Sequence, residues 1–287
     1  MEGNHYLLEG CTKSSVHWKT IFKDPTLPLV VDIGCGMGVS ILGLATSTGI
    51  SCNDNEIDNP IIDIDWNRCN FLGADLSQIG INFACSITKR WNLGDNVHFT
   101  VAPAEDIIEC VANTYPGKVK LCMIQFPTPF RFNDDVLKSH EEQSGSGEEM
   151  KIKSVTNKGN LQLPTDAFSG FMVTNKLIQS AGSALDSKEG LLLLQSNCED
   201  VAVFMNRLAN DAGFVSIPSR NSVAKIIDSK DGIPQRTQKW IDLGGERAEG
   251  PIWNRETVLP SVRGATETEV ACLLNGTPVH RVLLKPS

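Results

Sequence analysis

A short apolar run that ends in three closely spaced glycines constrains the fold of this chain more than any other feature. Residues 29–33 are apolar except for Asp32, as expected of a strand that is buried on both faces of a parallel sheet. Glycines follow at alternate positions: Gly34, Gly36 and Gly38. Apolar residues then return at helical spacing over residues 39–46. A strand, a glycine turn and a helix in this order predict the first unit of an α/β sheet, with a ligand at the carboxyl end of the strand.

The alternation of strands and helices continues through most of the chain. Further strands are expected over residues 71–75, 97–101, 120–125, 190–196, 214–217 and 279–284. Helices are expected over residues 77–91, from 107 onward, 165–181 and 199–211. Ser77 is the expected N-cap of the first of these helices, and Thr165 or Asp166 that of the third. One face of the helix after Ser77 is expected to carry Ile79, Phe83, Ala84, Ile87 and Trp91.

This pattern predicts a doubly wound, mostly parallel sheet of seven strands in which the last strand is antiparallel. Two polar stretches interrupt it, at about residues 51–68 and 133–158, and both are interpreted as surface insertions. The aspartates of the first stretch lack the spacing of an EF-hand loop, which favours a solvated loop over a calcium site. Residues 1–287 are therefore interpreted as a single domain.

The charge of the chain bears on its possible partners. The formal net charge is −8, which argues against a general nucleic-acid coat protein because phosphate binding depends on Lys and Arg. The excess of acidic side chains lies within residues 1–218, whereas residues 219–287 carry more basic than acidic side chains. A polyanion is therefore expected to meet the C-terminal part.

The sequence also indicates where the protein is located and which sites to exclude. No apolar run approaches the roughly 20 residues that span a bilayer, and the first residues lack a signal-peptide pattern. We expect no membrane association and a cytoplasmic location, with the nucleus or an organelle as alternatives if a targeting segment precedes residue 1. The nine cysteines form no C-x-x-C pair and no cluster with histidine. They are predicted to be reduced and mostly buried, and no metal site is expected.

The glycine turn has neighbours that favour S-adenosyl-L-methionine (SAM) as its ligand. Asp32 is placed to accept a hydrogen bond from an amino group, and Asp75, which ends the second strand, from ribose hydroxyls. A glycine cluster alone also fits a tight turn without ligand, but both acids accompany this one in the right order. The rival ligand NAD requires G-x-G-x-x-G, and position 39 is Val39.

The segment after the third strand offers a further contact to the cofactor. In methyltransferases with a Rossmann-like fold this place contacts the adenine, and the backbone amide of Ala104 or the side chain of Glu105 is the candidate here. Glu105 and Asp106 equally suit the first turn of the following helix, where acids interact favourably with the helix dipole.

Four segments in order make the chain resemble the tRNA (guanine-N7)-methyltransferases of bacterial type. They are residues 32–38, 70–75, 125–130, and 266–269 followed by 276–281. The resemblance covers most of residues 28–285 and implies a Rossmann-like class I SAM-dependent methyltransferase fold. It also implies methyl transfer from SAM to N7 of a guanine in the variable loop of tRNA, and it makes Gln125 a cofactor-binding residue.

The resemblance further implies residues on the acceptor side. Pro127 and Arg131 correspond to substrate-binding positions, while Thr128 stands where the family has a catalytic acid. The family's tryptophan is replaced by Phe130, and the basic run that follows it is missing apart from Arg131. Thr266 and Glu269 match residues that line the cofactor and guanine pocket, with Glu269 also assigned a catalytic role. Thr266 as an N-cap and Glu269 as its capping-box partner are compatible with those roles.

Three functions are consistent with these features. The first is a SAM-dependent tRNA (guanine-N7)-methyltransferase, with tRNA as substrate, that diverges in its substrate loop. The second is a SAM-dependent enzyme of the same fold that acts on another RNA or on a small molecule. The third is a catalytically silent relative that binds RNA or a protein partner, although no feature of the sequence points to a particular protein.

Overall fold

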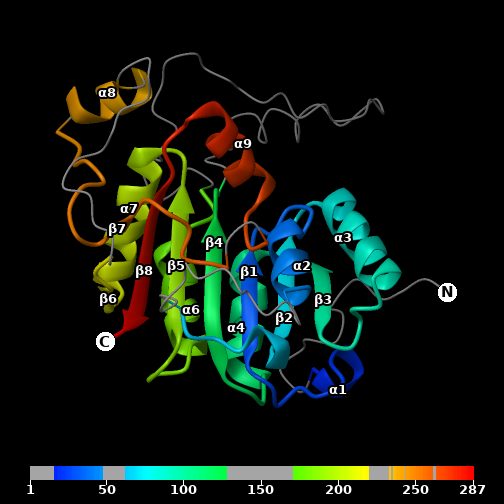
Figure 1. Cartoon of the computed structure of the whole chain (residues 1–287). Coiled ribbons are helices and arrows are strands. Elements are labelled where there is room, and N and C mark those ends of the chain that lie inside the picture. The colour runs from blue at the N-terminus through cyan, green and yellow to red at the C-terminus, as the bar shows by residue number, and fades with distance from the viewer. Residues whose placement is uncertain are drawn as a thin grey trace, which may run out of the picture.

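The computed structural model describes residues 16–47, 62–127, 171–219, 233, 235–242, 244–260 and 263–287. Eight strands form one sheet in the order β3-β2-β1-β4-β5-β8-β6, with β7 paired to β8 beside this path (Figure 1). The strands are β1 (Leu29–Ile33), β2 (Asn70–Asp75), β3 (Val97–Val101), β4 (Val119–Gln125), β5 (Leu191–Ser196), β6 (Phe214–Ser216), β7 (Trp253–Asn254) and β8 (His280–Pro286).

The sheet is parallel from β3 to β5, and β8 runs antiparallel to β5, β6 and β7. The predicted mostly parallel, Rossmann-like sheet with an antiparallel last strand is therefore confirmed. The strands expected over residues 214–217 and 279–284 are also present, and they pair with each other through residues 214–216 and 284–286. The expected strand number needs correction, since the two-residue strand β7 was not predicted.

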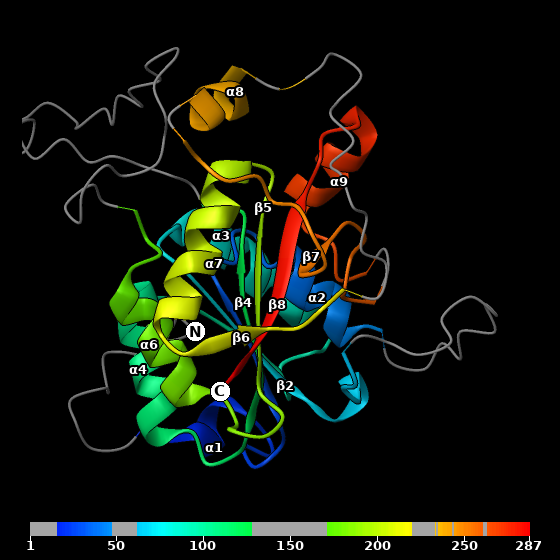
Figure 2. The same ribbon diagram turned by 90° about the vertical axis from the view of Figure 1, so that its left-hand side faces the viewer.

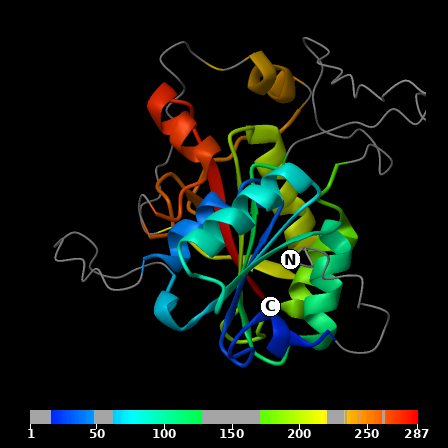
Figure 3. The same cartoon turned by 90° about the vertical axis from the view of Figure 1, so that its right-hand side faces the viewer.

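Helices cover both faces of the sheet (Figures 2 and 3). They are α1 (Trp18–Ile21), α2 (Val39–Ala45), α3 (Gln78–Arg90), α4 (Ala104–Thr114), α6 (Asn175–Ala184), α7 (Glu199–Asp211), α8 (Gln235–Asp242) and α9 (Glu267–Asn275), with a 3₁₀ turn η2 at Trp66–Arg68. One core lies under α4, α6 and α7, and the other lies under α2 and α3. Val31 faces the first core and its neighbour Val30 the second, as the two-residue repeat of a strand requires.

Helix α3 begins at the predicted cap but buries a different face from the one expected. Ser77 Oγ accepts a hydrogen bond from Gly80 N at 3.2 Å. The side chain of Ile79 is 84% exposed, and Phe83 and Trp91 are also exposed. The buried residues of this helix are Gly80, Ile81, Ala84 and Thr88. The expected apolar face was therefore right only for Ala84, which is buried, and Ile87, which packs partly buried against the core. The rest of the buried face differs because small residues let α3 approach the glycine turn closely, as Gly80 does at the carbonyl of Gly36.

Two other helix starts also differ from the predictions. Helix α6 does not begin at Thr165 or Asp166, because residues 171–174 are not helical and Thr174 is the N-cap. The Thr174 hydroxyl accepts from Leu177 N at 3.0 Å. Helix α4 begins at Ala104, three residues before the predicted start, with Pro103 at the N-cap position. The insertion at 133–158 and all of the first insertion before residue 62 lie outside the described residues.

The carboxyl ends of the parallel strands meet at one edge of the sheet, and α9 lies across that edge beside the ends of β1 and β4 (Figure 1). None of the helices within the described ranges has the length and apolarity that crossing a membrane requires.

Candidate functional site

The glycine turn after β1 has the geometry of a ligand-binding loop. Gly34, Gly36 and Gly38 all adopt a left-handed conformation, with φ of 77°, 56° and 72°. The turn is tied to β2, because the amides of Gly34 and Cys35 donate to the carbonyl of Ala74 at 2.8 and 3.1 Å. Its backbone is therefore fixed at the carboxyl end of the sheet.

Two of these glycines are needed for different reasons. A Cβ on Gly38 would lie 2.4 Å from Phe99 Cε1, so this glycine allows the start of α2 to pack closely against β3. A Cβ on Gly36 would meet no described atom within 4 Å. The glycine at position 36 therefore keeps open a space that no packing contact fills.

Asp75 closes the other side of this space. Its Oδ2 accepts from the amide of Gly36 at 2.9 Å, and its Oδ1 accepts from the amide of Ser77 at 2.7 Å. A carboxylate has about four acceptor positions, so two remain for hydroxyl groups of a ligand. The second strand thus places Asp75 directly against the loop, as the sequence predicted for a ribose-binding acid.

Asp32 is a buried acid with one oxygen left over. The residue is 1% exposed, and its Oδ2 accepts from Gln125 Nε2 at 3.2 Å. Its Oδ1 is buried and has no hydrogen-bond partner among the described residues. Burial raises the pKa of Asp32 to about 7, and the nearby Asp75 and Glu267 add to the rise, while the hydrogen bond from Gln125 lowers it. A cationic donor from a ligand would complete this carboxylate.

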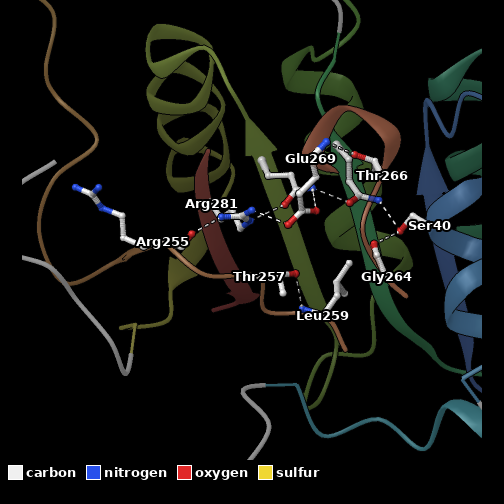
Figure 4. Close-up of polar contacts among 10 residues, drawn as sticks. Ser40, Arg255, Thr257, Leu259, Gly264, Thr266, Glu269 and Arg281 are labelled. Atoms are coloured by element: carbon white, nitrogen blue, oxygen red, sulfur yellow. Dashed lines mark hydrogen bonds and ion pairs between the residues drawn. The ribbon is translucent and has the colours of Figure 1, made fainter. Parts of the chain in front are cut away.

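From Asp32 a chain of buried polar side chains runs along the edge of the sheet. Gln125 Oε1 accepts from Gln195 Nε2 at 2.8 Å, and Gln195 Oε1 accepts from Arg281 Nε at 3.1 Å. Arg281 Nη2 then donates to Glu269 Oε1 at 2.6 Å. Figure 4 shows Arg281 between Glu269 of α9 and the backbone carbonyl of Arg255, to which Nη1 donates.

A second branch of the same network reaches the segment before α9. Gln125 Nε2 also donates to Ser40 Oγ at 3.2 Å, and the Ser40 hydroxyl donates to the carbonyl of Gly264 at 2.7 Å (Figure 4). The resemblance makes Gln125 a cofactor-binding residue. Its side chain contacts both Asp32 and Ser40, and Ser40 in turn binds the backbone of Gly264.

Thr266 and Glu269 occupy the first turn of α9. Thr266 is the predicted N-cap, and its hydroxyl accepts from the amide of Glu269 at 3.1 Å. The predicted capping box is not complete, because the Glu269 side chain binds Arg281 rather than the amide of Thr266. The carboxylate of Glu269 is buried and bound to Arg281, with a longer contact to Gln195 Nε2 at 3.4 Å. Glu269 is therefore half of a buried ion pair, a feature that the sequence did not predict.

The proposed adenine contact lies at the start of α4. Ala104 is the first residue of the helix, and its neighbour Glu105 lies in the first turn. The Glu105 carboxylate accepts from the hydroxyl of Thr174 and pairs with Lys176 at 3.2 Å, so it links α4 to α6. The hydrogen bond from the Thr174 hydroxyl lowers the pKa of the Glu105 carboxyl, and Lys176 lowers it further. This geometry agrees with the helix-start alternative for Glu105.

The substrate loop is described only at its beginning. Pro127 is buried, and Phe126 before it has a φ of 50°, a left-handed value that costs energy for a residue with a large side chain. The amide of Phe126 donates to the carbonyl of Gln195 at 2.8 Å, which fixes this turn against β5. Thr128, Phe130 and Arg131 lie outside the described residues.

Sequence reasoning missed three residues of this network: Ser40, Gln195 and Arg281. Gln195 lies next to the end of β5 and faces Gln125 on β4 in register. Arg281 pairs with Gln195 in the antiparallel register of β5 and β8, 86 residues along the chain. Gln195 could have been recognised as a candidate, because it is a polar residue near the end of a strand that is otherwise rich in leucine. The antiparallel direction of the last strand was predicted, but the register of β8, which placed Arg281, could not be read from the pattern.

Behind the network, His280 is buried among cations. Its burial, followed by the charges of Arg255, Arg247 and Arg281, lowers its pKa to about 3. Arg247 itself pairs with the buried Glu199 at 2.8 Å. His280 is thus neutral at physiological pH and is not available as a proton donor there.

The cysteines that the structure describes are free thiols. Cys35, Cys69, Cys110, Cys122 and Cys272 are buried, and Cys85 and Cys198 are partly buried, in agreement with the prediction of reduced, mostly buried thiols. Among the described residues no group of three or more His, Cys, Asp or Glu side chains is arranged to hold a metal ion.

Comparison with known proteins identifies no family for the chain. No family model matches the sequence, and no curated protein matches it either.

Several solved structures are similar over most of their length. The [4+2]-cyclase SpnF is 13% identical, with 93% of this chain and 77% of that chain covered and a TM-score of 0.40. Precorrin-6y C5,15-methyltransferase from Geobacter metallireducens is 12% identical, with 91% and 80% covered and a TM-score of 0.42. The YcgJ protein from Bacillus subtilis is 12% identical, with 94% and 96% covered and a TM-score of 0.38. Because all three TM-scores are below 0.5, the function has to be argued from the residues of this chain.

Proposed function

We propose that the protein is a SAM-dependent methyltransferase. The observation that carries this proposal is the buried, unpartnered Oδ1 of Asp32 beside a glycine turn whose Gly36 leaves an unfilled space. A buried carboxylate oxygen without a partner is costly, so it points to a ligand with a positive donor group. The amino-acid moiety of SAM has such a group, and Asp75 adds acceptors for its ribose.

The residues of the chain have separate tasks in holding this cofactor. Asp32 would accept from the ammonium group, the amides and open space at Gly34, Gly36 and Gly38 would admit the amino-acid moiety, and Asp75 would accept from the ribose. Gln125 would orient the carboxylate of Asp32, while the amide at Ala104 would contact the adenine. Because the side chain of Glu105 is occupied by Thr174 and Lys176, we assign it to the support of α4.

The proposed acceptor is N7 of a guanine in tRNA. This assignment rests on the resemblance of residues 125–130 and 266–269 to the tRNA (guanine-N7)-methyltransferases. When bound, SAM supplies a methyl group on a sulfonium centre. N7 carries a lone pair at neutral pH, so no side chain has to remove a proton, and the demands on the protein are alignment and exclusion of water.

The residues of the acceptor side fit these modest demands. Pro127, Thr128 and Arg131 would border the guanine and the adjacent phosphate, and Thr266 would fix the turn that faces it. Glu269 would contribute negative charge near the purine as it becomes positive, although Arg281 balances much of this charge. Glu269→Ala should therefore lower the rate of methyl transfer, and full activity of that variant would contradict the assignment.

Two measurements test the proposal in sequence. Calorimetric titration with SAM and with S-adenosylhomocysteine should show binding, and silence toward both would contradict any cofactor-dependent function. Purified protein with SAM and unmodified tRNA should then form N7-methylguanine, detected by mass spectrometry of the nucleosides. Binding without this product would contradict tRNA guanine as the acceptor.

A variant of Asp75 tests the cofactor site directly. Asp75→Ala should weaken binding of S-adenosylhomocysteine by roughly 1–3 kcal/mol, because a charged acceptor is removed. Asp211→Ala, at an exposed position at the end of α7, is the matched control and should leave the affinity unchanged. Equal affinities of both variants would show that Asp75 does not contact the ligand.

A second acceptor class is favoured by one observation. The formal net charge is −8, and only Arg131 remains where the family has a run of basic residues. Fewer cations weaken the attraction of RNA phosphates, which suits a smaller or less charged acceptor. A protein that binds SAM and leaves tRNA unmodified would favour a methyltransferase for another RNA or a small molecule.

A further inference from the structure

Polar side chains from four strands and one helix form a continuous buried chain at the carboxyl edge of the sheet. Its members are Asp32 on β1, Gln125 on β4, Gln195 on β5, Arg281 on β8 and Glu269 on α9. Each of these five side chains is at least nine-tenths buried. The chain joins the acid of the proposed cofactor site to the helix of the proposed acceptor site.

The hydrogen bonds between Arg281 and Asp32 all point toward Asp32. Gln125 gives its amide hydrogens to Asp32, so its oxygen faces Gln195. Gln195 must then turn its amide hydrogens toward Gln125, which leaves its own oxygen for Arg281. A carboxylate at one end and a guanidinium at the other thus fix the orientation of both amides, and bonds arranged in this way strengthen one another.

Arg281 is the branch point at the far end. Its three guanidinium nitrogens donate to three different parts of the structure: Gln195 on β5, Glu269 on α9 and the backbone carbonyl of Arg255 after β7. The planar fork of arginine suits this task, whereas lysine would offer a single nitrogen at the end of a flexible chain.

Helix α9 depends on these contacts because it buries little else. Among its nine residues only Glu269 and Cys272 are buried. Its apolar residues Val270, Leu273 and Leu274 are exposed, with Leu273 and Leu274 at 80% and 81%. The position of its first turn is therefore set chiefly by the buried carboxylate of Glu269.

We propose that Gln195 and Arg281 are positioning residues that hold Glu269, and with it the first turn of α9, in a fixed relation to Asp32. This inference rests on the proposed function. A ligand that binds Asp32 keeps the Asp32 carboxylate charged and oriented. This favours the observed orientation of the Gln125 and Gln195 side-chain amides and the observed position of α9. Cofactor binding is thereby coupled to the order of the helix that would meet the acceptor.

An ion pair that served packing alone would not need this arrangement. Replacing a buried ion pair with apolar side chains of similar size is often neutral or stabilising. A chain of oriented amides that reaches from the pair to Asp32 adds no apolar contact, yet it makes the geometry at one end depend on the other.

Hydrogen exchange read by mass spectrometry tests this coupling without reference to the acceptor. The probe is S-adenosylhomocysteine at a concentration that saturates each protein, and the readout is exchange at the amides of residues 267–275. In the wild type the ligand should slow this exchange at least about threefold, an effect that even a small coupling free energy produces. In Gln195→Met the ligand should still bind within about tenfold of wild-type affinity, and the protection of α9 should disappear.

Further variants separate positioning from general destabilisation. Gln195→Glu removes the donor but keeps the shape, and it should lose the ligand-dependent protection as Gln195→Met does. Gln179→Met, an exposed glutamine on α6, should retain it. Arg281→Met should also lose it, whereas Lys285→Met, exposed on the same strand, should not.

The outcomes distinguish this inference from the proposed function. Failure of the wild type to bind S-adenosylhomocysteine would overturn the proposed function and this inference with it. Binding without protection of α9, or protection that survives in both Gln195 variants, would overturn the inference and leave the cofactor assignment intact.

Discussion

Asp32 is subject to two opposing influences on its ionisation. Burial favours the neutral acid and raises its pKa to about 7, whereas the ammonium group of the proposed ligand requires the carboxylate. Only the ionised fraction of Asp32 is ready to bind. The affinity for S-adenosylhomocysteine should therefore be constant just above pH 7 and should fall by up to about tenfold per pH unit below it. Calorimetry between pH 5.5 and 8 measures this dependence, and a constant affinity over that range would contradict it.

The same group affects the stability of the ligand-free protein with the opposite sign. Since folding raises the pKa of Asp32, its contribution is fully favourable below the unfolded pKa of about 4 and is lost as the pH rises toward 7. Asp32→Asn should then melt at a higher temperature than wild type at pH 8, with a gap that narrows toward pH 4. Folding lowers the pKa of His280, so the contribution of His280 to the stability of the protein is lost as the pH falls. This contribution is the same in wild type and in Asp32→Asn, and it cancels when the two are compared.

The ion pair between Glu269 and Arg281 gives a prediction about stability. Glu269→Leu or Arg281→Met alone should each cost roughly 3–5 kcal/mol, because a buried charge is left without its partner. The double variant should recover most of this loss. Urea unfolding measures all three, with Lys23→Met in the exposed pair with Asp95 as a control that should change little. Additive losses in the double variant would show that the two charges are not coupled.

At the scale of one element, alanine substitutions in the glycine turn should have different effects, because a methyl group on Gly38 would clash with the core and one on Gly36 would enter open space. Gly38→Ala should destabilise the protein most, because its Cβ would clash with the ring of Phe99. Gly36→Ala should cost only the roughly 1–2 kcal/mol of a left-handed alanine, as should Gly244→Ala, which also has open surroundings.

The two open glycines should differ in ligand binding. Gly36→Ala should lower the affinity for S-adenosylhomocysteine at least about tenfold, since its methyl group enters the space of the ligand. Gly244→Ala should not change it. Thermal melting and calorimetry on the three variants separate fold from site, and unimpaired binding by Gly36→Ala would place the ligand elsewhere.

The strands were easier to predict than the positions of the helices. Residues 29–33 and 97–101 form strands with the predicted ends, because a buried strand shows a continuous apolar run that stops at a turn. The buried face of helix α3 was mispredicted from the apolar pattern, because the closest contact of this helix is made by Gly80 rather than by its large side chains. The start of α6 at Thr174 depends on a cap whose signal did not stand out from the other hydroxyl residues before it.

The geometry around the proposed cofactor site was predicted more fully than that around the proposed acceptor site. Asp32, Gly36 and Asp75 are local to two strand ends, so their approach follows from parallel topology alone. The ion pair of Glu269 depends on the register of β8 against β5, which is a long-range property. The family resemblance therefore proposed Glu269 as a site residue but could not supply its partner.

At the scale of the whole molecule, β8 joins the two cores. Val282 and Leu284 belong to the core under α4, α6 and α7, while Leu283 belongs to the other. Leu283→Ala should therefore cost roughly 2–5 kcal/mol, because it leaves a cavity in the core under α2 and α3. Leu274→Ala, at an exposed position on α9, should cost little. Chemical denaturation compares the two, and equal losses would contradict the central place of β8.

The antiparallel insertion of β8 between β5 and β6 also has a consequence for biosynthesis. β5 is translated before its partner β8, so a growing chain exposes a leucine-rich strand edge until β8 has been synthesised. Such edges invite pairing with other chains. The chain is thus open to such pairing until β8 has been made, and the proposed site, which includes Arg281, is completed only then.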